Sequence, residues 1–362
     1  MKVVTVVGAR PQFIKAAVVS HELAKRHEEI IVHTGQHFDY NMSEKFFEEL
    51  DIPAPKYNLG ISGGTHAQMT GKMMIGIEDI LIKEHPDWLL VYGDTNSTLA
   101  AALAASKLNI PICHVEAGNR TFSKTNPEEK NRICTDHLAT LLCASNQASM
   151  VYAKNEGLGD RIFLVGNPMY DAFLQNSGKL KKEEIVLSLL SGKTSPVPER
   201  YYYLTCHREE NTSNDNDLFE IFKAMQQLEY PTVYPVHPRN RERALRLFKQ
   251  HNFDKLILTE PVGYLESLCL IKNAEKIVTD SGGLQTEAFF AEKKCITVLD
   301  FVCWQETMVA NRNELSRPIA SEIFEKLNKQ QTVDKSYLPF GDGHSAEKIV
   351  KLMEEKYLES KV

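Results

Sequence analysis

Acidic side chains follow several short apolar runs, at positions where they could move protons. Asp94 follows the apolar run at 88–92 after a single glycine, Glu116 comes directly after the run at 110–115, and Glu128 opens a helical pattern. Three carboxylates at the ends of neighbouring strands and in their connecting loop would repel one another. That raises the pKa of at least one and suits it to proton transfer at carbon. Each also has a structural explanation, because Asp94 suits a helix cap and Glu128 the first turn of a helix.

A Ser-Gly-Gly turn offers a place for phosphate. The apolar run at 276–279 leads through Asp280 into Ser281-Gly282-Gly283, and helix-forming residues follow at once. Glycines let a backbone approach a ligand closely, and the first free N–H groups of a helix favour an anion such as a diphosphate. Glu287, about one turn further on, is within reach of a ribose hydroxyl. The alternative is an ordinary strand–helix loop in which the glycines only turn the chain.

Cations and histidines occupy similar strand-end positions. Arg10 and Lys15 flank Pro11, which suits the first turn of a helix, so both could dock phosphates or could simply lie on the surface. His207 follows the run at 201–205 and could serve a leaving phosphate or be structural. His237 lies between two prolines and is interpreted as structural. The chain has no Gly-x-Gly-x-x-Gly after its first strand and no His-Glu-x-x-His, so we predict neither a dinucleotide cofactor nor a catalytic metal.

The elements that must position these residues alternate along the whole chain. Short apolar runs predict strands at 3–7, 29–33, 88–92, 110–115, 140–144, 161–165, 201–205, 232–235, 255–258, 276–279 and 295–299. Helical patterns between them include 13–26, 67–84, 98–108, 218–228, 239–251 and 284–291. Strands that are apolar on both faces are typical of buried parallel sheets. The fold class is therefore α/β, with two Rossmann-like, doubly wound domains whose strand ends face one cleft.

A polar, lysine-rich stretch at 175–200 separates the two series of strands. We predict that it connects the domains and carries one helix around 183–190. The N-terminal domain is expected to comprise residues 1–170 and 345–362, and to carry the acidic residues. The C-terminal domain, 171–344, is expected to hold the phosphate turn. An amphipathic helix at 345–357 would pack back onto the first half.

The composition of the chain bears on whether it binds nucleic acid, lies in a reducing compartment or spans a membrane. The formal charge of −6 and the absence of a long basic run disfavour nucleic acid. Seven cysteines without a Cys-x-x-Cys pair favour a reducing cytoplasm. No apolar stretch approaches the ~18 residues needed to span a membrane, and the N-terminal run is better interpreted as a buried strand than as a signal sequence.

Seven motifs together resemble the non-hydrolysing UDP-N-acetylglucosamine 2-epimerase family, over nearly the whole length of the chain. They are Gly-Ala-Arg-Pro-Gln-Phe-Ile-Lys at 8–15, His-Thr-Gly-Gln-His at 33–37, Gly-Asp-Thr-Asn-Ser-Thr at 93–98, His-Val-Glu-Ala-Gly-Asn-Arg at 114–120, Pro-Glu-Glu-Lys-Asn-Arg at 127–132, His-Arg-Glu-Glu-Asn at 207–211 and Thr-Asp-Ser-Gly-Gly-Leu-Gln-Thr-Glu-Ala at 279–288. The resemblance implies a glycosyltransferase-B-like fold, a homodimer, and inversion at C2 of a UDP-2-acetamido sugar without cofactor or metal.

In this family UDP leaves by anti elimination to a 2-acetamidoglycal and then adds back. The resemblance assigns acid/base roles to Asp94, Glu116 and Glu128 and places His207 near the departing diphosphate. It assigns substrate or phosphate binding to Arg10, Lys15 and Arg132, and UDP binding to Ser281, Gly282, Gly283 and Glu287. Which carboxylate serves which face of the sugar stays open.

Departures from the family pattern leave the sugar open as well. Cys303-Trp304-Gln305-Glu306 replaces the usual Arg-Pro-Glu, and Phe38-Asp39-Tyr40 lacks residues common in members with an activating substrate site. The segments 12–13, 66–71 and 262–266 look more like the branch acting on UDP-2,3-diacetamido-2,3-dideoxyglucuronate, which is the alternative substrate. A glycosyltransferase sharing the fold and the UDP site is the alternative from another enzyme class.

Overall fold

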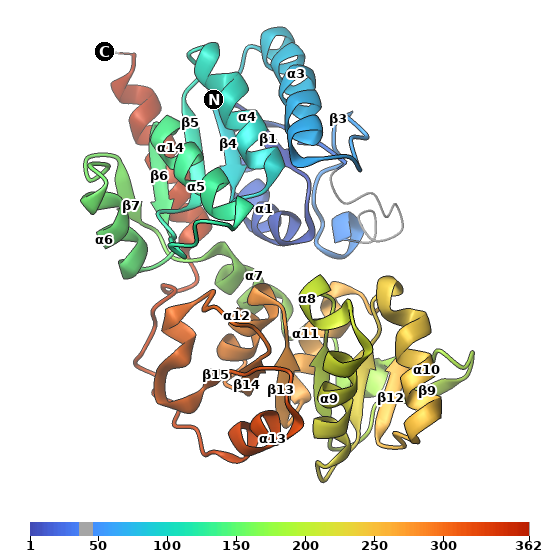
Figure 1. The fold of residues 1–362 in the computed structure, drawn as a ribbon. Coiled ribbons are helices and arrows are strands. Elements are labelled where there is room, and N and C mark those ends of the chain that lie inside the picture. Colours follow the sequence, from blue (N-terminus) through green and yellow to red (C-terminus); the bar gives the residue numbers. More distant parts are fainter. Residues whose placement is uncertain (36–45, 362) are drawn as a thin grey trace. The chain divides into compact units, whose positions relative to one another are not determined.

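A computed structural model describes residues 1–35 and 46–361 of the chain. The chain divides into two compact units, one made of Met1–Leu174 with Leu338–Val362 and the other of Gln175–Tyr337 (Figure 1). The boundaries predicted from the sequence are 170/171 and 344/345. The compact units instead divide the chain at 174/175, within helix α7 (Pro168–Asn176), and at 337/338.

The first unit is built on a seven-stranded parallel sheet with the order β3-β2-β1-β4-β5-β6-β7. The chain places β2 and β3 on one side of β1 and then β4 to β7 on the other side. The strand order therefore reverses between β1 and β4. Its strands are β1 (Lys2–Val7), β2 (Glu28–His33), β3 (Tyr57–Asn58), β4 (Trp88–Tyr92), β5 (Ile112–Ala117), β6 (Leu141–Ala144) and β7 (Ile162–Leu164). Its helices are α1 (Arg10–Leu23), α3 (His66–Glu84), α4 (Asn96–Lys107), α5 (Pro127–Leu138), α6 (Gln147–Asn155), α7 and α14 (Ser345–Glu359).

The second unit repeats this design with a six-stranded parallel sheet in the order β12-β11-β10-β13-β14-β15. Here the order reverses between β10 and β13. The strands of this sheet are β10 (Tyr202–Thr205), β11 (Thr232–Pro235), β12 (Leu256–Thr259), β13 (Lys276–Thr279), β14 (Lys294–Thr297) and β15 (Asn313–Leu315). The strands β8 (Val186–Ser188) and β9 (Thr194–Pro196) form a separate two-stranded sheet. Its helices are α8 (Glu209–Thr212), α9 (Asp215–Gln226), α10 (Arg241–His251), α11 (Tyr264–Asn273), α12 (Gly282–Phe290) and α13 (Ala320–Asn328), with 3-10 turns η1 (Lys182–Glu184), η2 (Pro238–Asn240) and η3 (Gln305–Asn311). The predicted pair of Rossmann-like sheets is confirmed.

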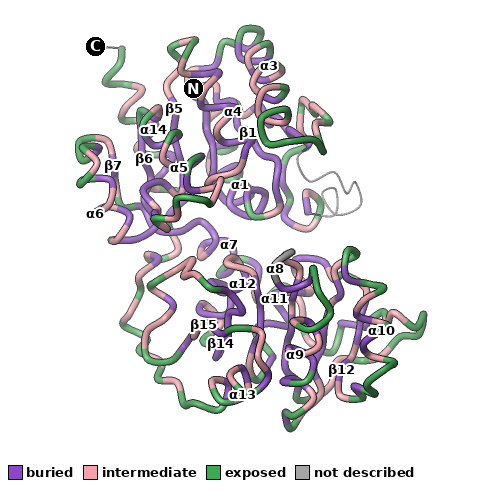
Figure 2. The backbone as a smooth tube through the Cα atoms, in the orientation of Figure 1, coloured by how far each residue is buried: buried purple, intermediate pink, exposed green. Residues whose placement is uncertain are grey.

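Both sheets are buried on both faces, as the apolar runs predicted (Figure 2). In β1, Val4 and Val6 pack with α3 and α4 in one core cluster. In β10, Tyr202 and Leu204 pack against α9, whereas Tyr203, like Tyr201 just before the strand, faces α11 and α12. The period of two along each strand thus supplies two cores per sheet. The helices that cover them hold the strand ends, and so the loops, in fixed register.

The helix predicted around 183–190 is wrong. Residues 182–184 form only the 3-10 turn η1, and β8 then pairs antiparallel with β9. Within β8 only Leu187 is buried, between exposed Val186 and Ser188, and it packs in the cluster that contains Tyr203. Alternation with a period of two is the signature of a half-buried strand, and here it outweighs the helix-favouring lysines and glutamates nearby.

Helix α14 returns to the first unit and packs against α1. His27 Nε2 lies 2.8 Å from Glu354 Oε1, and the backbone N–H of Ala346 donates to Asp171 on α7 at 2.9 Å. Ile349, Val350 and Met353 are buried on its inner face. The C-terminal helix thereby completes the first unit.

Candidate active site

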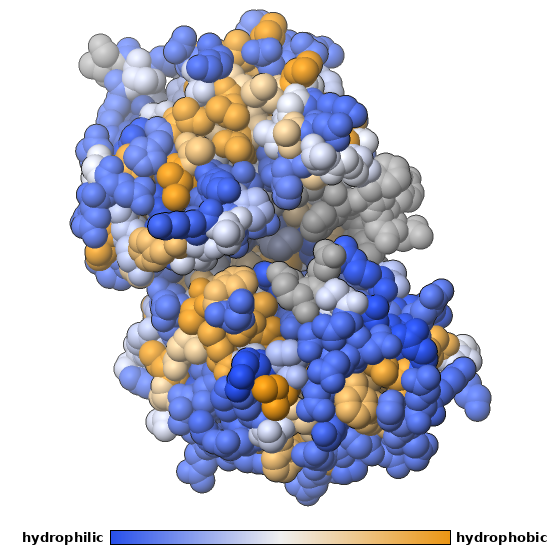
Figure 3. Space-filling view, in the orientation of Figure 1, coloured by the Kyte–Doolittle hydropathy of each residue, from blue (hydrophilic) through white to orange (hydrophobic). Residues whose placement is uncertain are grey.

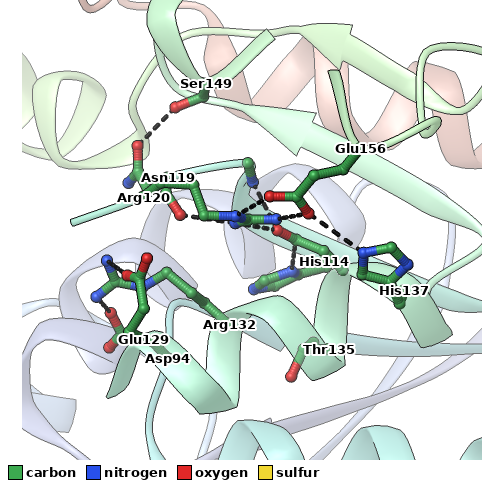
Figure 4. Close-up of polar contacts among 12 residues, drawn as sticks. Asp94, His114, Asn119, Arg120, Glu129, Arg132, Thr135, His137, Ser149 and Glu156 are labelled. Atoms are coloured by element: carbon green, nitrogen blue, oxygen red, sulfur yellow. Dashed lines mark hydrogen bonds and ion pairs between the residues drawn. The ribbon is translucent and has the colours of Figure 1, made fainter. Parts of the chain in front are cut away.

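Asp94 lies in the turn after β4, at the point where the strand order of the first sheet reverses. Its carboxylate pairs with the guanidinium of Arg132 on α5, and Arg132 Nη1 also lies 3.1 Å from Glu129 Oε2 (Figure 4). Burial by itself lowers the pKa of Arg132, but the carboxylates around it, Asp94 first, raise it more, so the net shift is upward. Arg132 therefore stays charged and holds Asp94 in place, and the alternative that Asp94 caps α4 is not realised, because Thr95 does so.

Glu116 lies at a break in the pairing of β5 with β6. The pairing of β5 with β6 shifts register between Val115 and Ala117, and Glu116 adopts a positive φ of 69°. A bulge of this kind re-aims a side chain, and a non-glycine residue in this conformation is typical of functional sites. The carboxylate forms an ion pair with Lys15 of α1, and the two side chains are only 10% and 5% exposed. Lys15 is thus committed to Glu116 rather than lying on the surface.

Glu128 lies in the first turn of α5, one turn before Arg132 and on the same face of the helix. Asn126 caps this turn by accepting from the N–H groups of Glu128 and Glu129 at 2.7 and 3.2 Å. The half-buried carboxylate of Glu128 has no partner within the described part of the chain. Of the three predicted acids, it is the one that no cation restrains among these residues.

Glu129, the neighbouring acid, has a structural role. Its carboxylate accepts from the backbone N–H groups of Thr121 and Phe122, both at 2.9 Å, and is almost fully buried. Because it also contacts Arg132, it ties the loop before α5 to the Asp94 pair. The sequence shows two adjacent glutamates without indicating which of them faces the protein interior.

Arg10 and Gln12 lie in the first turn of α1, which follows β1, the strand that pairs with β4. The Arg10 guanidinium lies over the Phe46 ring, 4.6 Å from its centroid, and makes no ion pair with a described residue. Gln12 accepts from the N–H groups of Gly8 and Ala9 and donates to the carbonyl of Tyr92 at 2.8 Å. This buried amide joins the loops after β1 and β4, the two strands that flank the reversal point.

In the second unit, His207 and Asp280 meet at the corresponding point, between the ends of β10 and β13. His207 Nδ1 lies 3.1 Å from Asp280 Oδ1, and the N–H groups of His207 and Arg208 donate to Asp280 Oδ2, both at 2.8 Å. Burial raises the pKa of Asp280, but these hydrogen bonds and the His207 ring outweigh it and lower the pKa to about 2. Asp280 therefore stays ionised and orients the half-exposed His207 ring so that Nε2 is left for a ligand.

The Ser-Gly-Gly turn opens α12 as predicted. Ser281 is the N-cap and accepts from Leu284 N at 3.4 Å, while the first helical N–H groups, at Gly282 and Gly283, have no intrahelical acceptor. A Cβ atom added at Gly282 would lie 3.1 Å from Cys303 Sγ, so this glycine makes room for the protein itself. Glu287, about one turn along, is buried.

The described residues contain neither a metal-ligand cluster nor a membrane-spanning helix. Within residues 1–35 and 46–361, no group of three or more His, Cys, Asp or Glu side chains is arranged to hold a metal ion. In the same ranges, no helix combines the length and the apolar character that crossing a membrane requires. The end of the motif at 33–37 and Phe38-Asp39-Tyr40 lie outside the described residues.

The chain matches a family model described as UDP-N-acetylglucosamine 2-epimerase over residues 21–354. The chain belongs to this UDP-N-acetylglucosamine 2-epimerase family. The resemblance predicted from the seven motifs is confirmed. The family name fits two features described above, the carboxylates of the first unit and the helix N-terminus of the second, which is suited to phosphate.

Relatives within the epimerase family carry two different substrate names. A "UDP-N-acetylglucosamine 2-epimerase homolog" of Methanococcus maripaludis is 46% identical over 98% of this chain and 99% of its own length. The UDP-2,3-diacetamido-2,3-dideoxy-D-glucuronate 2-epimerase of Pseudomonas aeruginosa is 41% identical over the same shares. The solved UDP-GlcNAc 2-epimerase of Methanocaldococcus jannaschii, in complex with UDP-GlcNAc and UDP, has a TM-score of 0.86 and 39% identity, covering 98% of this chain and 100% of its own.

The sequence patterns assign no individual role to Asp280, Gln12, His114 or Asp136, although the first three belong to the motifs at 279–288, 8–15 and 114–120. An aspartate directly after a buried strand could have been found by the same argument that singled out Asp94. The contacts of Gln12 and Asp136 depend on distant segments and carry no local signal.

Proposed function

We propose that this protein is a non-hydrolysing UDP-N-acetylglucosamine 2-epimerase, an isomerase that interconverts the gluco and manno forms of its UDP-sugar. The observation that carries the proposal is the pair of carboxylates, Asp94 and Glu116, on neighbouring loops of one sheet, each held by its own buried cation. Inversion at C2 requires a proton to leave from one face of the sugar and return on the other, which two separately mounted acids can provide. Membership of the epimerase family supports it.

The reaction begins with removal of the C2 proton by a carboxylate, while the bond from C1 to the UDP oxygen breaks with UDP anti to that proton. A 2-acetamidoglycal and UDP result. UDP then adds back to C1 as a proton is delivered to the opposite face of C2. The C2 hydrogen is only weakly acidic, so the base and the stabilised leaving group must act together. Glu128 is the third candidate acid, and Arg10, Lys15 and Arg132 supply positive charge around the sugar.

The leaving group belongs to the second unit in this proposal. The N–H groups of Gly282 and Gly283 and the cap Ser281 would receive the diphosphate, with Glu287 on the ribose. His207, oriented by Asp280, would donate from Nε2 to the departing phosphate oxygen. The observation that supports this assignment is the ionised, buried Asp280, which holds both the His207 ring and the backbone beside it.

The experiment that tests the function is incubation with UDP-N-acetylglucosamine in D2O, followed by NMR at C2. We expect deuterium at C2 in both epimers and accumulation of the manno form. UDP release without deuterium at C2 would instead support the glycosyltransferase alternative. No exchange with either candidate sugar would refute the epimerase assignment.

UDP-2,3-diacetamido-2,3-dideoxyglucuronate is the second candidate substrate. The Pseudomonas relative that carries this name is 41% identical, the same identity as the UDP-N-acetylglucosamine 2-epimerase of Methanocaldococcus jannaschii. The two sugars differ at C3 and C6 but carry the same hydrogen and acetamido group at C2, so the same acids would serve both. Parallel measurement of kcat/KM on the two sugars decides between them.

A homodimer and a cytoplasmic location complete the proposal. Ile75 and Ile82 of α3 are 62% and 51% exposed and lie two turns apart on one face, and Figure 3 shows apolar surface over α3 and α4. A second copy of the chain would cover that surface, and sedimentation of Ile75→Arg against the wild type tests it. All seven cysteines are free thiols, which suits a reducing compartment.

A further inference from the structure

A buried ionic network lies behind the Asp94 and Glu116 loops. His114 on β5 and Asp136 on α5 are both 0% exposed, and His114 Nδ1 lies 2.7 Å from Asp136 Oδ1. Arg120 joins them, with Nη1 2.7 Å from Asp136 Oδ2 and a two-point contact to Glu156. Burying a carboxylate and a guanidinium together with an imidazole ring is costly, so their retention here calls for a local reason.

The histidine side of the network holds the turn that carries Asp94. His114 Nε2 lies 2.7 Å from the carbonyl oxygen of Gly93, and the Gly93 N–H donates to the carbonyl of Val115 at 2.9 Å. Gly93 has a φ of 61°, a conformation that a glycine adopts readily and that leaves its peptide groups pointing at β5. Both polar groups of the residue before Asp94 are therefore anchored to β5.

The aspartate side of the network holds the loop that carries Glu116. Asp136 Oδ2 accepts from the N–H of Gly118 at 3.1 Å, two residues after Glu116. Gly118 has a φ of 79°, and a Cβ atom there would lie 2.5 Å from the Ser149 carbonyl. One carboxylate thus connects both segments: through His114 it reaches Gly93, and directly it reaches Gly118.

Hydrogen-bond donors face acceptors throughout this network. Both ring nitrogens of His114 face oxygens that accept, so both bonds are made only when the ring carries two protons. Burial raises the pKa of Asp136, but His114 and Arg120 outweigh it and the net shift is downward, which keeps the carboxylate ionised. A neutral asparagine in its place could not accept on both sides, because one end of its amide is an NH2 group.

We infer that Asp136 and His114 are positioning residues that set the separation of the Asp94 and Glu116 carboxylates. The inference rests on the proposed function, since it concerns the two acids of that reaction. A displacement of about 1 Å of a catalytic group can cost roughly 100-fold in rate. Substrate binding and UDP affinity should change little, because the proposed UDP groups lie on the other unit.

The test compares Asp136→Asn and His114→Leu with His114→Gln, whose side-chain amide can still donate to Gly93. We expect the first two to lower kcat roughly 10- to 100-fold per folded molecule, with KM and the Kd for UDP within about threefold. His114→Gln should recover a clear part of kcat. Glu156→Gln is the matched control, because Glu156 binds the same Arg120 side chain but contacts neither Gly93 nor Gly118.

Hydrogen exchange measured by mass spectrometry gives a readout that needs no activity. Asp136→Asn should lose protection in peptides covering 93–98 and 116–122, and Glu156→Gln should not. Unchanged protection, an equal effect of the control, or a fall in kcat that only follows the folded fraction would overturn the inference. If the wild type incorporates no deuterium at C2 of either sugar, the proposed function is refuted instead. The amide hydrogen-exchange data would still decide this inference. If Asp136→Asn does not fold, the two His114 variants decide it.

Discussion

The Lys15–Glu116 ion pair offers a quantitative test of how this site is held together. Both side chains are at least nine-tenths buried, with exposures of 5% and 10%. At about 4 Å and an effective dielectric of about 20 the attraction is roughly 4 kcal/mol, but removing two charges from water costs a comparable amount. The pair therefore contributes little to the net free energy of folding, whereas breaking it leaves one buried charge without compensation.

We accordingly predict a large coupling in a double-mutant cycle of Lys15→Met and Glu116→Met. Each single variant should lose about 3–5 kcal/mol of unfolding free energy at pH 7, while the double variant should stay within about 2 kcal/mol of the wild type. A cap on each loss follows from ordinary titration, because an unpaired lysine or glutamate can neutralise itself at a cost of roughly 4–5 or 3–4 kcal/mol at pH 7. The loss in Glu116→Met should then shrink as the pH rises, and the loss in Lys15→Met as it falls.

The chain provides a convenient probe for this measurement. It has two tryptophans, and Trp88 is buried in the first unit whereas Trp304 belongs to the second. In a Trp304→Phe background, urea unfolding followed by fluorescence reports the first unit alone. Additive losses, with the double variant as unstable as the two single variants combined, would refute the reasoning that these charges matter to each other.

Three further predictions concern the acids and the phosphate turn. Asp94→Asn should lower kcat by roughly 10²- to 10⁴-fold while calorimetry finds the Kd for UDP unchanged; loss of UDP binding would mean that Asp94 is structural. Asp280, with its pKa of about 2 against about 3.9 in peptides, contributes about 2 kcal/mol of stability above pH ~4 that disappears as the pH falls towards 2. The stability difference between wild type and Asp280→Asn should therefore shrink over that range, and a constant difference would contradict the role of the carboxylate. Gly282→Ala should weaken UDP binding, because the added Cβ lies 3.1 Å from Cys303 Sγ, and Cys303→Ala in the same chain should restore affinity; equal affinities of all variants would argue against a ligand at this turn.

Local patterns were enough to place most of the framework and the loops that matter. The strands β4, β11 and β13 occupy the residues that the apolar runs predicted, because a buried parallel strand needs apolar side chains on both faces. Once parallel sheets are expected, the polar residues after each strand must gather at one edge. That geometric rule singled out Asp94, Glu116 and the turn at 281–283 without any knowledge of contacts.

The partners of those residues depend on tertiary structure. Arg132 pairs with an aspartate 38 positions away, and the contact of Asp280 with the backbone of His207 spans 73 positions. A charge in the sequence carries no mark of which distant charge will be brought beside it, and the order of strands in a sheet, which makes the choice, is not a local property. The hairpin at 186–196 was missed for a related reason, since pairing with a neighbouring strand overrode helix propensity.

The opposite burial of Glu128 and Glu129 shows the same division within one dipeptide. Both glutamates begin α5, and either could have faced the loop or the site. The loop before α5 closes over Glu129, whose carboxylate it engages through two backbone N–H groups, and this leaves Glu128 as the acid with no described partner. Composition and periodicity indicated the acids, and long-range packing decided which of them have partners in the described structure.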